Sequence, residues 1–148
     1  MEKNFIKVQS NKDIIISLTL IIIGAALALL PLGGATNVTG IFIAITGIIL
    51  VFTLKNGYKE SISGERYSKK EYFYHINLKN ELINHIKTNP KAIEAGSDVS
   101  NNSLSMVIFY SKHSGKAYLQ LQEYIPYKYE ACTEMQECTL SEVEHLIK

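Results

Sequence analysis

The side chains best suited to chemistry in this chain are two cysteines and four histidines. Cys132 and Cys138 are separated by five residues, a spacing that matches neither a C-x2-C zinc knuckle nor a thioredoxin-like pair. In a cytoplasmic setting thiols stay reduced, so we expect structural thiols, with a regulatory disulfide or a metal site as alternatives. If the domain instead faced an oxidising compartment, a disulfide between them would become the leading interpretation.

One histidine has a carboxylate nearby in the sequence. Glu81 and His85 lie four residues apart, hence on one face of a helix, where they can share a hydrogen bond or a metal; a solvated pair explains the spacing equally well. The sequence contains no HExxH, Walker or Rossmann glycine motif, and the segment 61–64 lacks the leading glycine of a nucleophile elbow. We therefore predict no catalytic residue, no cofactor and no metal. A membrane-surface enzyme that uses His85 with Glu81, or a cysteine, is the alternative.

The nine tyrosines are the most unusual feature of the sequence, and all of them follow Leu54. Their rings are apolar while their hydroxyls seek a partner, which suits a sheet surface, a membrane interface or a protein contact. One interpretation is that they build a small core and its rim. The functional alternative is that Tyr124, Tyr127 and Tyr129, which bracket Pro126, form a recognition edge to which a peptide adds a strand.

Two uncharged stretches near the N-terminus determine how the rest of the chain is organised. The stretch from Ile14 to Leu32 has nineteen residues and the stretch from Val38 to Leu54 has seventeen. As helices they would be about 28 and 26 Å long, close to the hydrocarbon thickness of roughly 30 Å. The residues from Gly33 to Asn37 have the composition of a tight turn. The sequence thus predicts a transmembrane helical hairpin over 14–54, between an N-terminal segment 1–13 and a domain 55–148.

The first stretch allows two other interpretations. One is a buried hairpin of a soluble protein, which a domain this small is poorly able to cover. The other is a cleaved signal peptide, because Ala26-Leu27-Ala28 resembles a cleavage site. The apolar run continues past Ala28 and a second run follows it, which favours the hairpin.

Basic residues predict how the hairpin lies in the membrane. They flank both stretches, while the connecting turn has none, so the positive-inside rule places both termini in the cytoplasm. We expect a two-span protein of the cell inner membrane. The residues that carry this prediction are Lys3, Lys7, Lys12, Lys55, Lys59, Arg66, Lys69 and Lys70.

Small residues recur at helical spacing in both stretches. Gly24 and Ala28 lie four apart in the first, and Gly40, Ala44 and Gly47 share a face in the second. Small residues let helices approach closely in lipid, so these five are predicted to pack the two spans together. Recruitment of another membrane protein, or of a second copy, is the alternative. Neither stretch holds an ionisable residue, which disfavours a proton relay or an ion-coupled transporter.

The patterning of residues 55–148 predicts a small α+β domain in the order β-β-α-β-β, an antiparallel sheet with one packed helix. The helix is expected to open at Asn77, and the stretch after Pro126 is expected to be irregular as far as Glu137. A capping box by Thr139 with Glu142, or by Ser141 with Glu144, would open a terminal helix. The expected strands lie at 57–62, 66–75, 104–110 and 117–125.

Charge balance and a resemblance complete the prediction. A formal charge of +1 argues against a nucleic-acid partner. The run Gln122-Glu123-Tyr124-Ile125-Pro126-Tyr127-Lys128-Tyr129-Glu130 after two spans resembles an uncharacterised family of small bacterial membrane proteins. The resemblance implies this layout and says nothing about an activity, a cofactor or site residues. We expect a non-enzymatic membrane protein whose partners are the bilayer and another membrane or cytoplasmic protein or a second copy. An immunity or stress protein of the membrane is a further alternative.

Overall fold

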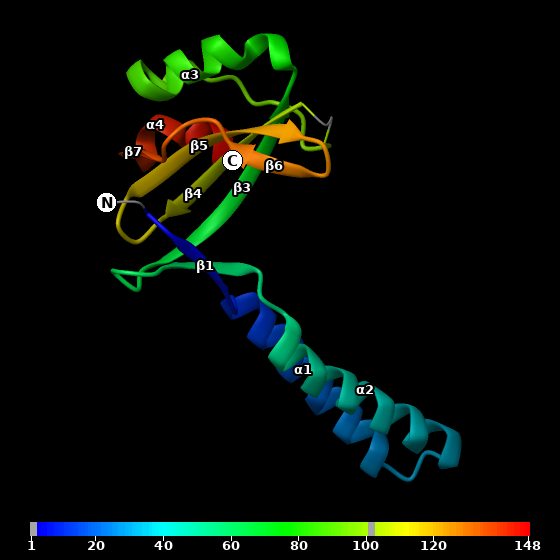
Figure 1. Ribbon diagram of the computed structural model, residues 1–148. Coiled ribbons are helices and arrows are strands. Elements are labelled where there is room, and N and C mark those ends of the chain that lie inside the picture. Colours follow the sequence, from blue (N-terminus) through cyan, green and yellow to red (C-terminus); the bar gives the residue numbers. More distant parts are fainter. Residues whose placement is uncertain (1–2, 101–102) are drawn as a thin grey trace. The chain divides into compact units, whose positions relative to one another are not determined.

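The computed structural model describes residues 3–100 and 103–148 (Figure 1). The chain divides into two compact units. The first, which we call the hairpin unit, is Phe5–Lys59. The second, the sheet unit, consists of the short N-terminal piece that ends at Asn4 together with Glu60–Lys148.

The hairpin unit is built on two helices that run side by side, α1 (Asn11–Leu29) and α2 (Gly34–Thr53) (Figure 1). Both are long and apolar enough to cross a membrane. Helix α1 begins at a capping box: the backbone N–H of Asp13 donates to Ser10 Oγ at 3.1 Å, and the N–H of Ser10 donates back to Asp13 Oδ2 at 2.8 Å.

The turn between the helices is shorter than predicted. The expected turn from Gly33 to Asn37 is wrong, because α2 already begins at Gly34. Asn37 lies in the first turn of α2, where its Nδ2 donates to the carbonyls of Ala28 at 2.7 Å and Leu30 at 3.2 Å. Those carbonyls belong to the end of α1, which has no following turn to satisfy them. The Asn37 side chain, which belongs to α2, therefore caps the C-terminal end of α1.

The helices bury small residues and expose large ones. The buried positions of α1 are Asp13, Ser17 and Gly24, and those of α2 are Gly40 and Gly47. Most of the isoleucines, leucines and phenylalanines of both helices are exposed. This distribution is opposite to that of a core helix in a soluble protein, so the buried soluble hairpin is not supported.

Two short strands flank the helices in sequence. Strand β1 (Phe5–Val8) precedes α1 and lies beside β2 (Gly57–Glu60), which follows α2. The sequence prediction missed β1, because four residues are too few for a period to be recognised. The predicted strand at 57–62 corresponds to β2 and ends two residues early.

The sheet unit holds a long antiparallel sheet. Strands β3 (Arg66–Tyr74), β4 (Leu104–Ser111) and β5 (Lys116–Ile125) are neighbours in that order. Two short strands, β6 (Lys128–Ala131) and β7 (Gln136–Thr139), both pair with the remaining side of β5. The predicted α+β class, two apolar helices followed by an antiparallel sheet with a packed helix, is confirmed, but the predicted irregular stretch to Glu137 is wrong.

Two longer helices and two 3-10 turns complete the sheet unit. A 3-10 turn (Ile76–Leu78) leads into α3 (Lys79–Thr88), so the prediction of Asn77 as the cap of this helix is wrong. Another 3-10 turn (Pro90–Ala92) follows. Helix α4 (Leu140–Ile147) begins with the predicted capping box, in which the N–H of Thr139 donates to Glu142 Oε2 at 2.8 Å.

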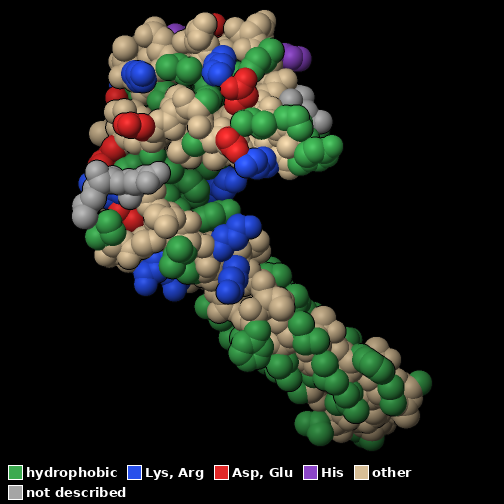
Figure 2. Space-filling model, viewed as in Figure 1, with side chains coloured by type: hydrophobic (Ala, Val, Ile, Leu, Met, Phe, Trp, Pro, Cys, Tyr) green, Lys and Arg blue, Asp and Glu red, His purple; other side chains and the backbone are tan. Residues whose placement is uncertain are grey.

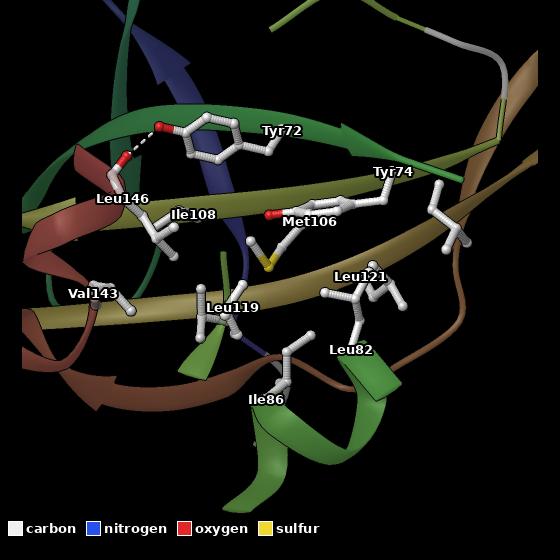
Figure 3. Packing of buried hydrophobic residues seen from close by; sticks show 13 residues of the cluster. Tyr72, Tyr74, Leu82, Ile86, Met106, Ile108, Leu119, Leu121, Val143 and Leu146 are labelled. Atoms are coloured by element: carbon white, nitrogen blue, oxygen red, sulfur yellow. Dashed lines mark hydrogen bonds between the residues drawn. The ribbon is translucent and has the colours of Figure 1, made fainter. Parts of the chain in front are cut away.

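The core lies between one face of the sheet and the helices α3 and α4 (Figure 3). Leu82 and Ile86 reach it from α3, and Val143 and Leu146 from α4. Two tyrosines take part through both ring and hydroxyl: Tyr72 Oη donates to the carbonyl of Leu146 at 2.6 Å, and Tyr74 Oη to that of Glu94 at 2.7 Å. The sheet contributes Tyr72, Tyr74, Leu104, Met106, Ile108, Ala117, Leu119 and Leu121.

Candidate functional site

The candidate site is the β5–β6 hairpin, which carries the four residues predicted as a recognition edge. Ile125 pairs with Lys128, so the loop has only two residues, Pro126 and Tyr127. Proline fixes its own φ near −65°, which suits the first loop position of a type II turn. The second position of that turn needs a positive φ, and Tyr127 has φ 80°.

Tyr127 occupies a position that normally belongs to glycine or asparagine. Among the described residues it is the one non-glycine with a positive φ, at a cost of about 1–2 kcal/mol. Packing does not offset this cost, because Tyr127 is 97% exposed. Its backbone N–H donates to Tyr124 Oη at 3.3 Å, which helps to hold the turn. The hairpin thus presents an aromatic ring to the surroundings from a strained turn.

The other two tyrosines of the hairpin are half-buried against each other. Tyr124 and Tyr129 are paired across β5 and β6, and their ring centroids are 5.3 Å apart in an edge-to-face arrangement. Phe73 of β3 lies 5.9 Å from the Tyr129 ring, and Ser100 Oγ lies 3.0 Å from Tyr129 Oη. These contacts form a rigid aromatic base for the exposed tip.

This aromatic base lies on the sheet face that points away from α3 and α4. Tyr72 and Tyr74 point into the core, so the alternation of side chains along β3 places Phe73 on the opposite face. Near it, Glu71 accepts hydrogen bonds from Ser105 Oγ at 2.5 Å and Lys69 Nζ at 2.8 Å. Burial alone would raise the pKa of Glu71, but these two donors outweigh it and hold the pKa below its usual range.

The predicted strand addition next to Pro126 is wrong in one respect. Strand β5 has neighbours on both sides, β4 on one and β6 and β7 on the other, so the end of β5 offers no free edge. The chain turns back at Pro126 and covers it. The outermost strand here is β6, which has four residues and an ion pair between Lys128 and Glu130. Short, charged edge strands resist pairing with another chain, so the tip of the hairpin is the better contact point.

The two cysteines lie at separate places on the sheet. The N–H of Cys132 donates to the carbonyl of Leu121 at 2.9 Å, whereas Cys138 pairs with Ala117. Leu121 and Ala117 are four residues apart on β5, or about 13 Å, while a disulfide joins Cα atoms less than about 7 Å apart. Burial raises the pKa of both thiols, that of Cys138 to about 12, which disfavours the reactive thiolate.

The remaining candidates for chemistry are not gathered into a site. Glu81 is exposed on α3 and His85 half-exposed on the same helix. Within residues 3–100 and 103–148 no group of three or more histidines, cysteines or carboxylates is arranged to hold a metal. The histidine for which the structure gives a close side-chain contact is His145, whose Nε2 lies 2.8 Å from the carbonyl of Ile93.

The five small residues predicted for helix packing lie where α1 meets α2. A Cβ added to Gly24 would lie 2.3 Å from the backbone nitrogen of Ala44, and one added to Gly40 would lie 2.5 Å from that of Ala28. A Cβ on Gly47 would lie 2.8 Å from the Ile21 side chain. The small-residue faces are therefore occupied inside the hairpin and are not available for another chain.

The sequence prediction missed the hydrogen bonds of Asp13, which join the two ends of the hairpin unit. Asp13 is 1% exposed and accepts three hydrogen bonds. Its Oδ2 accepts from the N–H groups of Ser10 at 2.8 Å and Asn56 at 2.9 Å, and its Oδ1 accepts from Asn56 Nδ2 at 2.8 Å. The start of α1 is thereby tied to the residues after α2. The Ser-x-x-Asp pattern at 10–13 indicates the capping box of Asp13 with Ser10, but not the contact with Asn56.

Comparison with known proteins gives no relative to guide this assignment. No protein-family model, curated protein or solved structure matches the chain.

Proposed function

We propose that this chain is a two-span membrane protein that presents a small, non-enzymatic interaction domain in the cytoplasm. Support for the membrane location comes from the exposed isoleucines, leucines and phenylalanines of α1 and α2. A soluble protein rarely exposes such a large contiguous apolar surface, whereas hydrocarbon accepts it at no cost. On the face shown in Figure 2, charged side chains lie at one end of the two helices, and the rest of the helix surface carries none.

The proposed orientation has both helix ends that carry lysines in the cytoplasm. Lys7 precedes α1, Lys12 lies in its first turn, and Lys55 and Lys59 follow α2. The turn between α1 and α2 has no basic residue. Since basic residues are retained on the cytoplasmic side, this asymmetry favours a cytoplasmic sheet unit and an external turn at the inner membrane.

The interaction role rests on Tyr127. An aromatic ring that is 97% exposed gains nothing from packing within its own chain, and its backbone is held at an unfavourable φ. Tyrosine is enriched at the centres of protein interfaces, where the ring fills a pocket and the hydroxyl finds a partner. We infer that the partner is a membrane or cytoplasmic protein with an apolar pocket that receives this ring.

In-cell photo-crosslinking tests this function. A photoreactive phenylalanine analogue is placed at position 127 of the full chain, and a matched control is placed at His113, which is exposed in the β4–β5 turn. We expect a discrete protein adduct from position 127 and none from position 113. A co-expressed unmodified chain should compete for the partner and reduce the adduct. A co-expressed Tyr127→Gly chain should keep the fold but should not compete. Equal adducts at both positions, or none at 127, would contradict the proposal.

A further inference from the structure

Four lysines surround the ends of α1 and α2 that lie next to β1 and β2. We call Lys7, Lys12, Lys55 and Lys59 the lysine collar, and all four side chains are exposed. The hairpin unit, Phe5–Lys59, contains one acidic residue, Asp13. Four lysines less one aspartate leave this unit with a formal charge of +3.

The single acidic residue does not neutralise the collar. The carboxylate of Asp13 is buried and is satisfied by Ser10 and Asn56. None of the four collar lysines has an ion-pair partner in the part of the chain that the structure describes, whereas six other lysines do. The collar is therefore positive charge that the protein leaves uncompensated.

The collar is attached to a fixed frame. Asp13 links the first turn of α1 to Asn56, one residue after Lys55. Gln9 Nε2 donates to the carbonyl of Val51 in the last turns of α2. Because both helix ends are tied together, lysines that are distant in sequence are held around one end of the hairpin, which lowers the entropic cost of binding a shared ligand.

The position of the collar indicates which kind of ligand it can meet. The stretch from Ile14 to Leu54 has no charge. Lys12 and Lys55 lie within two residues of its ends, and Lys7 and Lys59 lie farther out, in β1 and β2. If the helices span a bilayer, this is the depth of the phosphate groups. Lys12 lies in the first turn of α1, where the helix dipole is already positive, so an anion beside it is favoured electrostatically.

We propose that the lysine collar binds the phosphate groups of anionic phospholipids in the cytoplasmic leaflet. This inference rests on the proposed membrane insertion and adds a lipid class to it. Lysine ammonium groups attract phosphate as point charges, and clusters of basic residues beside a transmembrane helix concentrate anionic lipids. The anionic lipids would orient the base of the hairpin unit at the membrane surface.

The test uses the full chain in nanodiscs made from phosphatidylcholine with a minority of phosphatidylglycerol. Native mass spectrometry measures the lipids that stay bound when the disc is removed. We expect phosphatidylglycerol to be enriched several-fold, at least about threefold, over its share in the disc. The variant with all four collar lysines changed to glutamine should lose the enrichment. The variant with four arginines should keep it, because the charge is unchanged.

A matched control changes four exposed lysines of the sheet unit to glutamine: Lys87, Lys91, Lys112 and Lys128. This control removes the same charge and should retain the lipid enrichment. Equal loss in the control, or no enrichment in the unmodified chain, would overturn the lysine collar while leaving membrane insertion intact. A chain that is not retained in these nanodiscs would overturn both proposals.

Discussion

The hairpin unit and the sheet unit distribute the same residue types in opposite ways. In the sheet unit, isoleucine and leucine lie inside: Ile108, Leu119 and Leu121 have no exposed surface. In the hairpin unit they lie outside, and Ile22 is 67% exposed while Gly24, Gly40 and Gly47 occupy the interior. In water, folding buries apolar area. In the bilayer that we propose for the hairpin unit, close packing of small residues and backbone would be the main source of helix association.

This contrast shows that the two units depend on different forces. The sheet unit gains about 1.5–3 kcal/mol for each large apolar side chain that it removes from water. If the helices lie in a bilayer, as we propose, the hairpin unit gains no such energy from isoleucines that face outward. Its stability comes from contacts between backbones and from the hydrogen bonds that close its ends, including those of Asp13 and Asn37.

The largest expected effect is the loss of stability when a core isoleucine of the sheet unit is truncated, compared with an outward-facing isoleucine of the hairpin unit. Ile108→Ala should destabilise the sheet unit by about 2–5 kcal/mol, because it leaves a cavity in a core position without exposed surface. Ile22→Ala, at a position that faces outward, should change stability by less than about 0.5 kcal/mol. Urea unfolding of the full chain in detergent measures both. Equal costs would erase the contrast between the units.

A side chain added at the helix contact should affect the hairpin unit next most strongly. A Cβ at Gly40 would lie 2.5 Å from the Ala28 nitrogen, so Gly40→Leu must separate the helices, at a cost of about 1–3 kcal/mol or more. Gly34→Leu on the same helix is the matched control, because nothing lies within 4 Å of that position. Thermal unfolding followed by helical circular dichroism in detergent should separate the two variants.

Replacement of the tip tyrosine should stabilise the sheet unit. Tyr127→Gly relieves the positive φ at a position where the ring makes no packing contribution, so we expect a gain of up to about 1 kcal/mol. Tyr124→Gly, which removes the ring packed on Tyr129, should instead destabilise the hairpin. Urea unfolding distinguishes the signs. A loss of stability in Tyr127→Gly would mean that the ring packs within the chain.

The smallest expected effect is a change in how the stability of the sheet unit depends on pH. Hydrogen bonds from Lys3 and Ser63 hold the pKa of Glu60 below its ordinary 4.5. The folded state therefore binds this proton less readily than the unfolded chain, so the stabilisation is present above pH 4.5 and is lost as the pH falls through the lowered pKa. Glu60→Gln should be less stable at neutral pH and lose less stability in acid. Glu134→Gln, at an exposed position, is the control for the loss of one negative charge.

Periodicity was sufficient to predict the long elements, because each has a repeated pattern that packing preserves. Strands β4 and β5 and helix α4 lie within one or two residues of their predictions. Short elements failed for the opposite reason: β1, β6 and β7 have four residues each, and their pairing with distant partners decides their structure.

The sequence drew attention to the segment that we propose as the site, but it did not predict the geometry of that segment. The tyrosines around Pro126 stood out, yet a proline in a strand pattern indicated only where pairing stops. The type II turn needs a positive φ at Tyr127. Sequence rules expect glycine at such a position, so a tyrosine there gives no signal of the turn. The Asp13–Asn56 contact joins residues forty-three positions apart, and no local pattern indicates it.

The orientation of the two helices is tested most directly by cysteine labelling in intact cells. Cys132 and Cys138 are first replaced by serine. Single cysteines are then placed at two exposed positions, Leu32 in the turn between α1 and α2 and His113 in the β4–β5 turn. A maleimide that cannot cross membranes should label position 32 from outside and position 113 only after the cells are permeabilised. Labelling of position 113 in intact cells, or recovery of the chain in the soluble fraction without detergent, would contradict the account.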